Sequence, residues 1–371
     1  MATFKHNRLM IPGPVEVDPA VLKALCGPVE PHYGADWTKK YTRITSLLKQ
    51  VFNTNNDVFV MAGSGTNAID ASIGSSMMTG EKIIIGNNGF FGDRLVDIAK
   101  SYGLQIIEVK APWGEALDPA VIADTLKAHP DVKIVAVVHS ETSTTILNPI
   151  EAIGDIVKNS DALFLVDAVS SLGGVRIEVD SWGIDLCPSA SQKCLGATPG
   201  LGPVAISPKA WKMIDRTKEK AHGWYSNLQV WRDYAREWGD WHPTPVTMPV
   251  SVANGLLVSL EQLLSEGIDT RMQRYKTLAL KLRIGLREAG MQPFTQDDAL
   301  NPVLTAAYPP EGVNSAQVVN YLLDKHHIMI SGGLGALKTK VFRIGHMSPV
   351  ITDEDMDMLV MALKKFGQEL N

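Results

Sequence analysis

The sequence predicts an α/β fold: a large domain built on a mostly parallel seven-stranded sheet, followed by a smaller C-terminal α+β domain. Three observations support this. Seven short β-rich runs alternate with helical patterns between residues 58 and 207. Some runs are continuously apolar, as strands buried on both faces require. The 371 residues with 45% hydrophobic content suffice for one large core and a second, smaller one.

The strand predictions rest on short runs rich in β-branched residues, bounded by turn residues. The runs are VFVMA (58–62), KIIIGN (82–87), QIIEVK (105–110), KIVAVVH (133–139), ALFLVD (162–167), IDLCPSA (184–190) and GPVAIS (202–207). Helices are expected between them, for example over 93–103, which ends on Gly103, and from Pro119, which follows Asp118.

The chain changes character after the last of these strands. Residues 208–255 are rich in Trp and contain the Pro-broken segment HPTPVTMPV, which is typical of a bridging region that covers a subunit interface. A long helical pattern then runs from about 256 to Gly290, followed by short strands and helices. We therefore expect an N-terminal arm that reaches the partner subunit (1–20), a large domain (21–255) and a small C-terminal domain (256–371).

Composition and charge argue against several classes of protein. The formal net charge of −5, without a basic stripe, argues against nucleic-acid binding. No apolar run is long enough to span a bilayer, and the N-terminus has no apolar signal-peptide core. Three scattered cysteines without CxxC spacing indicate neither disulfides nor a metal site. We expect a cytoplasmic protein without nucleic-acid, membrane or metal partners.

Lys193 lies in SASQKCLGATPGLG (189–202), directly after a predicted strand and in a turn rich in Ser, Gly and Pro. No amphipathic pattern accounts for a lysine there. Catalytic lysines have a pKa lowered by burial or by nearby cations. Taken alone, Lys193 would be interpreted as a surface lysine on a loop, but the neighbouring motifs reverse that interpretation.

Asp167 ends the predicted strand ALFLVD, which places a carboxylate at the carboxyl edge of the sheet, where open α/β sheets bind ligands. A carboxylate there keeps a pyridine nitrogen protonated and makes the ring an electron sink, as pyridoxal-5'-phosphate (PLP) requires. Asp167 would equally cap the following turn. Its position 26 residues before Lys193, with one strand between them, favours a functional pair.

Three further segments carry candidate binding residues. The turn Gly63–Thr66 precedes a predicted helix, whose first N–H groups would hold a phosphate, although a purely structural turn fits as well. NNGFFGDR offers Phe91 to stack on a flat cofactor, with Phe90 as a core residue. Arg343, in an apolar strand, would bind a substrate carboxylate or form an internal salt bridge.

These motifs together resemble the class V aminotransferases, specifically the alanine–glyoxylate and serine–glyoxylate (serine–pyruvate) group. The resemblance runs from about Pro12 to the last helix and rests on six motifs in the family's order: GSGTNA, NGFFGDR, HSETSTT, LVDAVSSLGG, SASQKCLGATPGLG and RIGHMS. It implies a fold-type I PLP enzyme that works by a ping-pong reaction. It also implies a homodimer with shared active sites.

The resemblance also assigns roles, motif by motif. Lys193 resembles the Schiff-base lysine and Asp167 the partner of the pyridine nitrogen. Arg343 resembles the residue that binds the substrate carboxylate, and the segment that contains Tyr33 lies near the partner's substrate pocket. The remaining residues resemble cofactor-binding positions: Ser64, Gly65 and Thr66 at the phosphate, Gln192 beside it, Phe91 stacking, Thr142 at the phenolic oxygen, and Thr247 reaching the phosphate from the partner.

The sequence departs from the alanine–glyoxylate enzymes at two positions. Phe91 stands where they usually have Trp, and Thr244 where they usually have a Tyr that reaches the phosphate across the dimer. We expect transfer from a small amino acid, alanine or serine, to glyoxylate or pyruvate. Alternatives are an unusual donor (pyridoxamine, aspartate, a phosphonate or sulfonate amine) with pyruvate as acceptor. A lyase or desulfurase, and a silent PLP-binding scaffold, fit less well.

Overall fold

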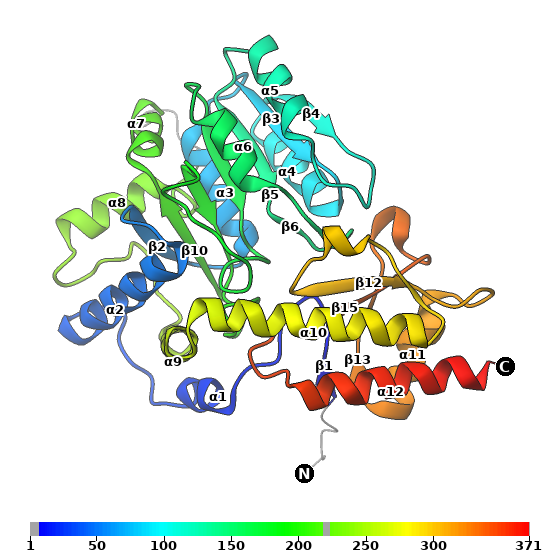
Figure 1. Cartoon of the computed structure of the whole chain (residues 1–371). Coiled ribbons are helices and arrows are strands. Elements are labelled where there is room, and N and C mark those ends of the chain that lie inside the picture. Colours follow the sequence, from blue (N-terminus) through cyan, green and yellow to red (C-terminus); the bar gives the residue numbers. More distant parts are fainter. Residues whose placement is uncertain (1–6, 218–222, 371) are drawn as a thin grey trace.

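The large sheet of the computed structural model, which describes residues 7–217 and 223–370, confirms the α/β prediction (Figure 1). All seven predicted runs become strands of one sheet in the order β2-β10-β9-β8-β5-β3-β4. Only β10 runs antiparallel to its neighbours. The strands are β2 (Asp57–Ala62), β3 (Lys82–Asn87), β4 (Gln105–Lys110), β5 (Ile134–Val138), β8 (Leu163–Asp167), β9 (Leu186–Pro188) and β10 (Leu201–Ile206).

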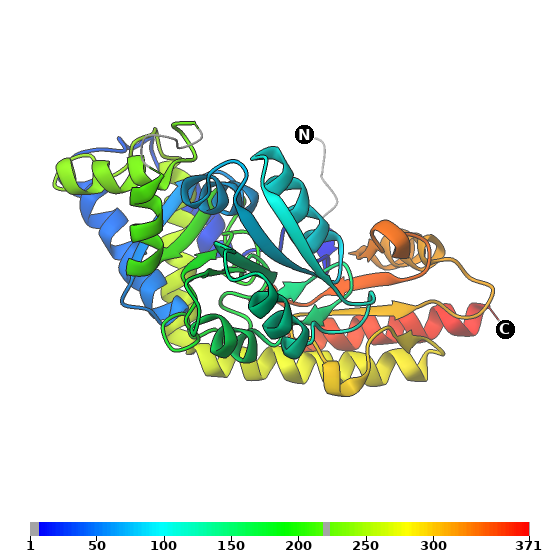
Figure 2. The same ribbon diagram turned by 90° about the horizontal axis from the view of Figure 1, so that it is seen from above.

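Helices cover both faces of this sheet, which explains its apolar strands. Helices α3 (Gly65–Ser76) and α4 (Phe90–Ser101) lie on one face, and α5 (Pro119–Ala128) and α6 (Ile150–Val157) on the other (Figure 2). Every residue of the central strands β5 and β8 is buried, whereas the edge strand β4 is largely accessible. Because β2, β3, β5, β8 and β9 point the same way, the loops that follow them meet at one edge.

The small domain is a four-stranded antiparallel sheet flanked by helices, in the order β11-β12-β15-β14. The strands are β11 (Gln292–Pro293), β12 (Leu304–Tyr308), β14 (Ser331–Gly332) and β15 (Phe342–Gly345), and the helices are α10 (Ile268–Glu288), α11 (Ser315–His326) and α12 (Asp353–Glu369). The other elements are α1 (Pro19–Leu25), α2 (Ala35–Phe52), α7 (Pro208–Arg216), α8 (Leu228–Glu237), β6 (Ser140–Glu141), β7 (Ile146–Leu147), η2 (Asp297–Ala299) and η3 (Gly335–Leu337).

The long helical pattern after residue 256 forms two helices instead of one. Helix α9 (Val250–Glu266) ends at Gly267, whose φ of +88° breaks the helical path before α10 begins. The buried leucines of α9 belong to the core of the large domain, and those of α10 to a second core. The two cores thus divide near Gly267, twelve residues after the domain boundary predicted from the sequence.

The N-terminal segment 8–16 lies between the small domain and the large sheet. Its strand β1 (Arg8–Leu9) pairs in parallel with β13 (Ile328–Met329), and Arg8 donates to both carboxylate oxygens of Asp355 on α12, at 2.9 and 2.5 Å. The Gly345 N–H then donates to the Met10 carbonyl at 2.8 Å. The segment therefore reaches the carboxyl edge of the sheet. Its predicted extension to a partner subunit stays a prediction, and residues 1–6 lie outside the described residues.

We predict that Gly345→Ala destabilises the protein by about 1–3 kcal/mol, the usual cost of overpacking. A Cβ at Gly345 would lie 2.1 Å from the Ile11 carbonyl oxygen, which is backbone and has no rotamer to change. Thermal or urea unfolding measures the loss. The control is Gly255→Ala, inside α9 with its nearest contacts at 3.4 Å, which should keep or raise stability because Ala favours helices. Equal stability of the two variants would contradict the packing argument.

Candidate active site

Most of the predicted site residues meet where the strands of the large sheet end. Asp167 ends β8, Ser64–Thr66 open α3 after β2, Phe91 lies in the first turn of α4 after β3, and Thr142 follows β5. Lys193 comes from the turn after β9, and Arg343 from β15 of the small domain. The chain thus brings six sequence-distant segments to one edge, at the junction of the two domains.

Asp167 is a buried carboxylate with one oxygen left open. Its Oδ1 accepts a hydrogen bond from the Val169 N–H at 2.9 Å, and Oδ2 makes none within the described part of the chain. Burial raises the pKa of Asp167 to about 6, while the Val169 N–H opposes the shift. A bound group that offers an N⁺–H to Oδ2 would restore its ionised form, as the predicted pyridinium does.

Lys193 is held by the N-terminal segment. Its Nζ donates to the Pro12 carbonyl, and its side chain packs against Gly13, where a Cβ would lie 2.5–2.7 Å from Cδ, Cε and Nζ. Gly13 has a φ of +94°, which favours glycine on its own. Burial lowers the pKa of Lys193 to about 8, so roughly a tenth of the amine is unprotonated at pH 7, far more than for an ordinary lysine.

The start of α3 suits a phosphate group. Ser64 is the N-cap of this 12-residue helix, and its exposed side chain makes no capping hydrogen bond. The N–H groups of Gly65 and Thr66 have no intrahelical acceptor and lie at the positive end of the helix dipole, whereas that of Asn67 donates to the Ser64 carbonyl at 2.9 Å. The Gln192 side-chain oxygen is buried without a hydrogen-bond partner, and the amide N–H group beside it is the part that would donate to a phosphate. These residues fit the predicted cofactor, because its phosphate needs several donors.

Phe91 and Thr142 flank the same space. The half-buried Phe91 ring contacts Phe90 edge-on at 5.6 Å, and the Arg94 guanidinium lies 4.7 Å from the Phe91 centroid. Thr142 is buried, and its carbonyl accepts a hydrogen bond from Arg343 Nη1 at 3.0 Å. A ring and a hydroxyl are therefore available for a flat, oxygen-bearing ligand.

Arg343 is buried with part of its guanidinium unused. Nε donates to the Gly332 carbonyl at 2.9 Å, and Nη1 to the Thr142 carbonyl. Within the described residues Arg343 forms no ion pair, so the internal salt bridge considered from the sequence is not made. Burial lowers its pKa to about 10, while the nearby Glu141 opposes the shift. An incoming carboxylate would supply the missing counter-charge.

Tyr33 and Thr247 lie elsewhere, in a surface cleft of about 520 Å³ between α1 and the start of α9. Tyr33 is 46% exposed and contacts the rings of Trp241 and His242 at 5.5 and 6.2 Å. None of the residues described above for the Lys193 site lines this cleft. A single chain therefore does not bring Tyr33 and Thr247 to its own Lys193.

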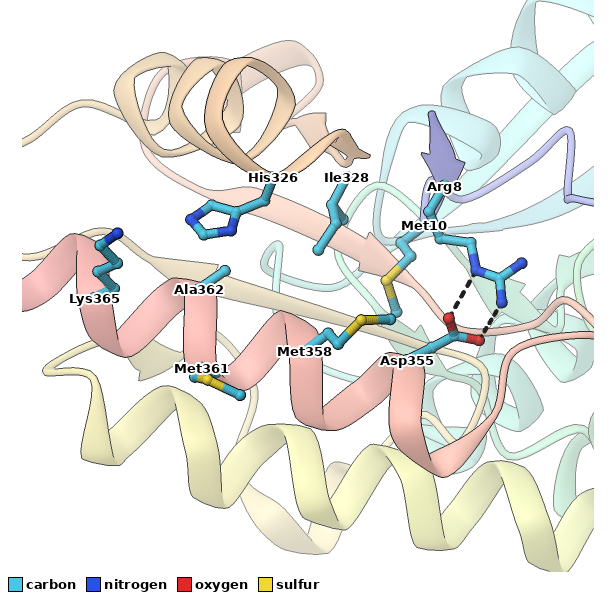
Figure 3. A pocket seen from close by; sticks show the side chains of 9 residues that line it. All are labelled: Arg8, Met10, His326, Ile328, Asp355, Met358, Met361, Ala362 and Lys365. Carbon is cyan, nitrogen blue, oxygen red and sulfur yellow. Dashed lines mark hydrogen bonds and ion pairs between the residues drawn. The ribbon is translucent and has the colours of Figure 1, made fainter. Parts of the chain in front are cut away.

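Figure 3 shows another cavity, of about 400 Å³, on the outer side of the small domain. It contains none of the predicted site residues, and the Arg8–Asp355 pair closes one end of it. It is lined by Arg8, Met10, His326, Ile328, Asp355, Met358, Met361, Ala362 and Lys365. Among the described residues no group of three or more His, Cys, Asp or Glu side chains is arranged to hold a metal ion.

Sequence reasoning missed three contributors to this site. Pro12 and Gly13 touch Lys193 directly, and their signal was the PGP turn that opens the resemblance. Glu141 and Ser143, in the motif HSETSTT, bind the start of α4. Arg94, one turn after Phe90, covers the Phe91 ring. The contacts of Pro12, Gly13, Glu141 and Ser143 join segments far apart in the chain, and the Arg94 contact depends on which side of the helix it occupies. Strand and turn patterns reveal neither kind of contact.

Comparison with known proteins identifies relatives along nearly the whole chain. Residues 27–359 match the family model described as aminotransferase class-V. An uncharacterized aminotransferase of Methanocaldococcus jannaschii is 39% identical over 98% of this chain and 94% of its own length. A protein of Synechococcus named as the small subunit of a soluble hydrogenase is 35% identical over 98% of this chain and 93% of its own.

Solved structures agree with this result. An alanine–glyoxylate aminotransferase from Nostoc has a TM-score of 0.93 and 34% identity, covering 98% of this chain and 95% of its own. The ureidoglycine–glyoxylate aminotransferase of Bacillus subtilis has a TM-score of 0.93 at 30% identity, covering 99% and 94%. With the family model spanning residues 27–359, these matches show that the chain belongs to the class V aminotransferases, which are PLP-dependent enzymes of fold type I.

Proposed function

We propose that this aminotransferase moves an amino group from a small amino acid, alanine or serine, to glyoxylate or pyruvate by a ping-pong reaction. The observation that carries the proposal is the buried Arg343, whose unpaired guanidinium edge lies in the same site as Lys193 and Asp167. A carboxylate of an amino acid or a 2-oxo acid satisfies that edge. Relatives named for alanine, ureidoglycine and glyoxylate support small substrates.

In this proposal Lys193 and Asp167 perform the acid–base work. Bound PLP supplies an electron sink for the bonds at the substrate Cα. Lys193 holds the cofactor at rest, and its freed Nζ then moves the Cα proton, for which its lowered pKa suits it. Asp167 Oδ2 keeps the pyridine nitrogen protonated.

The remaining predicted residues orient the cofactor and the substrate. Ser64, Gly65 and Thr66 hold the phosphate at the N-terminus of α3, with Gln192 beside it. Phe91 stacks on the ring, and Thr142 approaches its phenolic oxygen. Arg343 binds the substrate carboxylate, which fixes Cα over the lysine and excludes water from the guanidinium.

We propose further that the enzyme is a homodimer with shared active sites. Trp224, Trp238 and Trp241 are each about half exposed and lie on one aromatic surface with Tyr234 and Tyr33. A second copy would cover this surface and place its own Thr247 and Tyr33 against the partner's phosphate and substrate. Thr244 is buried and bonded to the Val246 carbonyl, so it offers no phenol-like reach across the dimer.

An unusual amine donor is the second candidate. Phe91 and Thr244 leave more space than Trp and Tyr at the corresponding positions, and the Arg94 guanidinium over Phe91 adds a cation beside the site. These features suit pyridoxamine, aspartate, phosphonate or sulfonate amines with pyruvate as acceptor. One solved relative is a pyridoxamine–pyruvate aminotransferase from Mesorhizobium loti.

A desulfurase or lyase function is disfavoured by the cysteines. Cys187 and Cys194 are fully buried, and burial raises the pKa of Cys194 to about 12. Cys26 is exposed but lies in the N-terminal part, before Tyr33. A silent scaffold would not need the unused donor of Arg343 or the unpaired side-chain oxygen of Gln192.

For location, we propose the cytoplasm, since the three cysteines are all free. None of the helices in the described ranges is long and apolar enough to cross a bilayer.

We predict that amino acids convert the visible absorption band of the purified holoenzyme to that of the amine form of the cofactor. Alanine or serine should do so at the lowest concentrations, and glyoxylate or pyruvate should restore the band. An enzyme that responds only to pyridoxamine, aspartate or a phosphonate or sulfonate amine would support the second candidate. Absence of any visible band after incubation with PLP would contradict the cofactor assignment.

We predict that Lys193→Ala retains PLP but loses amino transfer by at least about 10²-fold, the usual contribution of a positioned acid–base group. The phosphate and ring contacts remain, so dialysis should still show bound cofactor. Single-turnover absorbance with the best donor measures the rate. A rate within tenfold of wild type would exclude the proposed role of Lys193.

We predict that Gly13→Ala slows the single-turnover reaction about tenfold or more, because the added Cβ occupies the space of Lys193 Cδ, Cε and Nζ. The control is Gly80→Ala, which also has a positive φ, of +85°, but no atom within 4 Å of the added Cβ. Both variants place an alanine at a positive φ, so they carry a similar backbone strain. If both react equally fast, contact with Lys193 is not what requires glycine at position 13.

A further inference from the structure

Helix α4 is capped by side chains from another part of the chain. Its N-cap residue, Gly89, has no side chain, and the first three helical N–H groups bond to Glu141, at the end of β6, and to Ser143 just after it. Phe90 N–H donates to Ser143 Oγ at 2.9 Å, and the N–H groups of Phe91 and Gly92 donate to Glu141 Oε2 at 3.0 and 3.1 Å. The helix that carries Phe91 thus begins on a carboxylate about fifty residues away in sequence.

The bonding pattern requires Glu141 to be ionised. Glu141 is fully buried, and burial raises its pKa above the usual value, although its hydrogen bonds oppose the shift. Its Oε1 accepts from the Ser143 N–H at 2.9 Å and from Ser143 Oγ at 2.6 Å, since that hydroxyl is itself the acceptor for Phe90. All four partners donate, so a protonated Glu141 would face donors only. The positive end of the α4 dipole adds to the stabilisation of the charge.

The fit around Glu141 is tight, and the same turn reaches Arg343. A Cβ at Gly89 would lie 2.5 Å from Glu141 Cγ and Cδ and from Ser143 Oγ, so the carboxylate fills the space of a missing side chain. The next residue, Thr142, accepts the Arg343 hydrogen bond through its carbonyl. Glu141 therefore lies at the point where α4, the turn after β5 and the arginine of the small domain meet.

We propose that Glu141 is a positioning residue, whose buried carboxylate fixes Phe91, Thr142 and Arg343 relative to one another and supplies negative charge between Asp167 and Arg343. This inference rests on the proposed roles of those residues. Glu141 does not contact the substrate in this arrangement. It acts through α4 and the turn, and through its electrostatic effect on Asp167 and Arg343.

The test is Glu141→Gln in the full-length holoenzyme. The amide has one acceptor oxygen for four donors, so at least one donor loses its partner. We expect PLP to bind the apoprotein about tenfold more weakly, the size of one lost charge-assisted hydrogen bond. Loss of a negative charge also disfavours protonation nearby, so the pH midpoint of the cofactor band should fall by about half to one unit.

The matched control is Asp185→Asn. Asp185 is also a buried carboxylate that accepts from a backbone N–H, that of Phe164 at 3.0 Å, and from a serine hydroxyl, that of Ser207 at 2.5 Å. It precedes β9, at the opposite edge of the sheet. We expect Asp185→Asn to lower the melting temperature but to leave PLP affinity within about twofold and the pH midpoint unchanged.

Two milder variants separate the effect of the Glu141 charge from the effect of its side-chain length and hydrogen bonds. Glu141→Asp keeps the charge but is one methylene shorter, so it should restore the pH midpoint and not the PLP affinity. Ser143→Ala removes the hydroxyl between Phe90 and Glu141 and should weaken PLP binding by less than the loss expected for Glu141→Gln. If Glu141→Gln does not fold, the PLP affinity of Ser143→Ala tests the proposal in its place.

The outcomes are distinct. If Glu141→Gln, like Asp185→Asn, changes only the melting temperature, Glu141 is a structural carboxylate and the proposal is wrong. A wild-type protein that shows no cofactor band would instead overturn the proposed function itself.

Discussion

The burial of charge at the carboxyl edge of the large sheet is the constraint on which the site depends. Asp167, Glu141, Lys193 and Arg343 all lie at or near this edge, and burial is the largest influence on the pKa of each. An isolated buried charge is costly, so each needs partners. Glu141 has four donors, whereas Asp167 and Arg343 keep groups unpaired, and this difference separates a carboxylate that positions its neighbours from groups that are open to a ligand.

The surrounding fold holds these charged groups at fixed positions. The N-terminal segment is bonded to β13, β15 and α12 before it brings the Pro12 carbonyl to Lys193. The small domain is therefore coupled to the lysine by backbone contacts as well as through Arg343. A shift of the small domain would move both groups together, which suits an enzyme that must accept and release two substrates at one site.

Sequence patterns predicted the sheet and the residues at its edge, because apolar runs and glycine turns are local signals. All seven strands, Asp167 at the end of β8 and Ser64–Thr66 at the start of α3 follow from such signals. The break at Gly267 was missed because one glycine did not interrupt the apolar periodicity. Pro12, Gly13 and Glu141 could not be found this way, since their roles arise from contacts that span 181 and about 50 residues.

The site of one chain also explains why substrate choice was not predictable from its motifs. In the proposed function, Lys193, Asp167 and Arg343 recognise what every substrate shares, an amino or oxo group beside a carboxylate, and do not contact the rest of the substrate. The differences lie at Phe91, whose ring the Arg94 guanidinium covers, and at Tyr33 and Thr247, which line a cleft that does not include Lys193 of the same chain. In the proposed dimer, donor selectivity would depend on the start of α4 in one chain and on the aromatic surface of the other, so the motifs of either segment describe only part of the pocket.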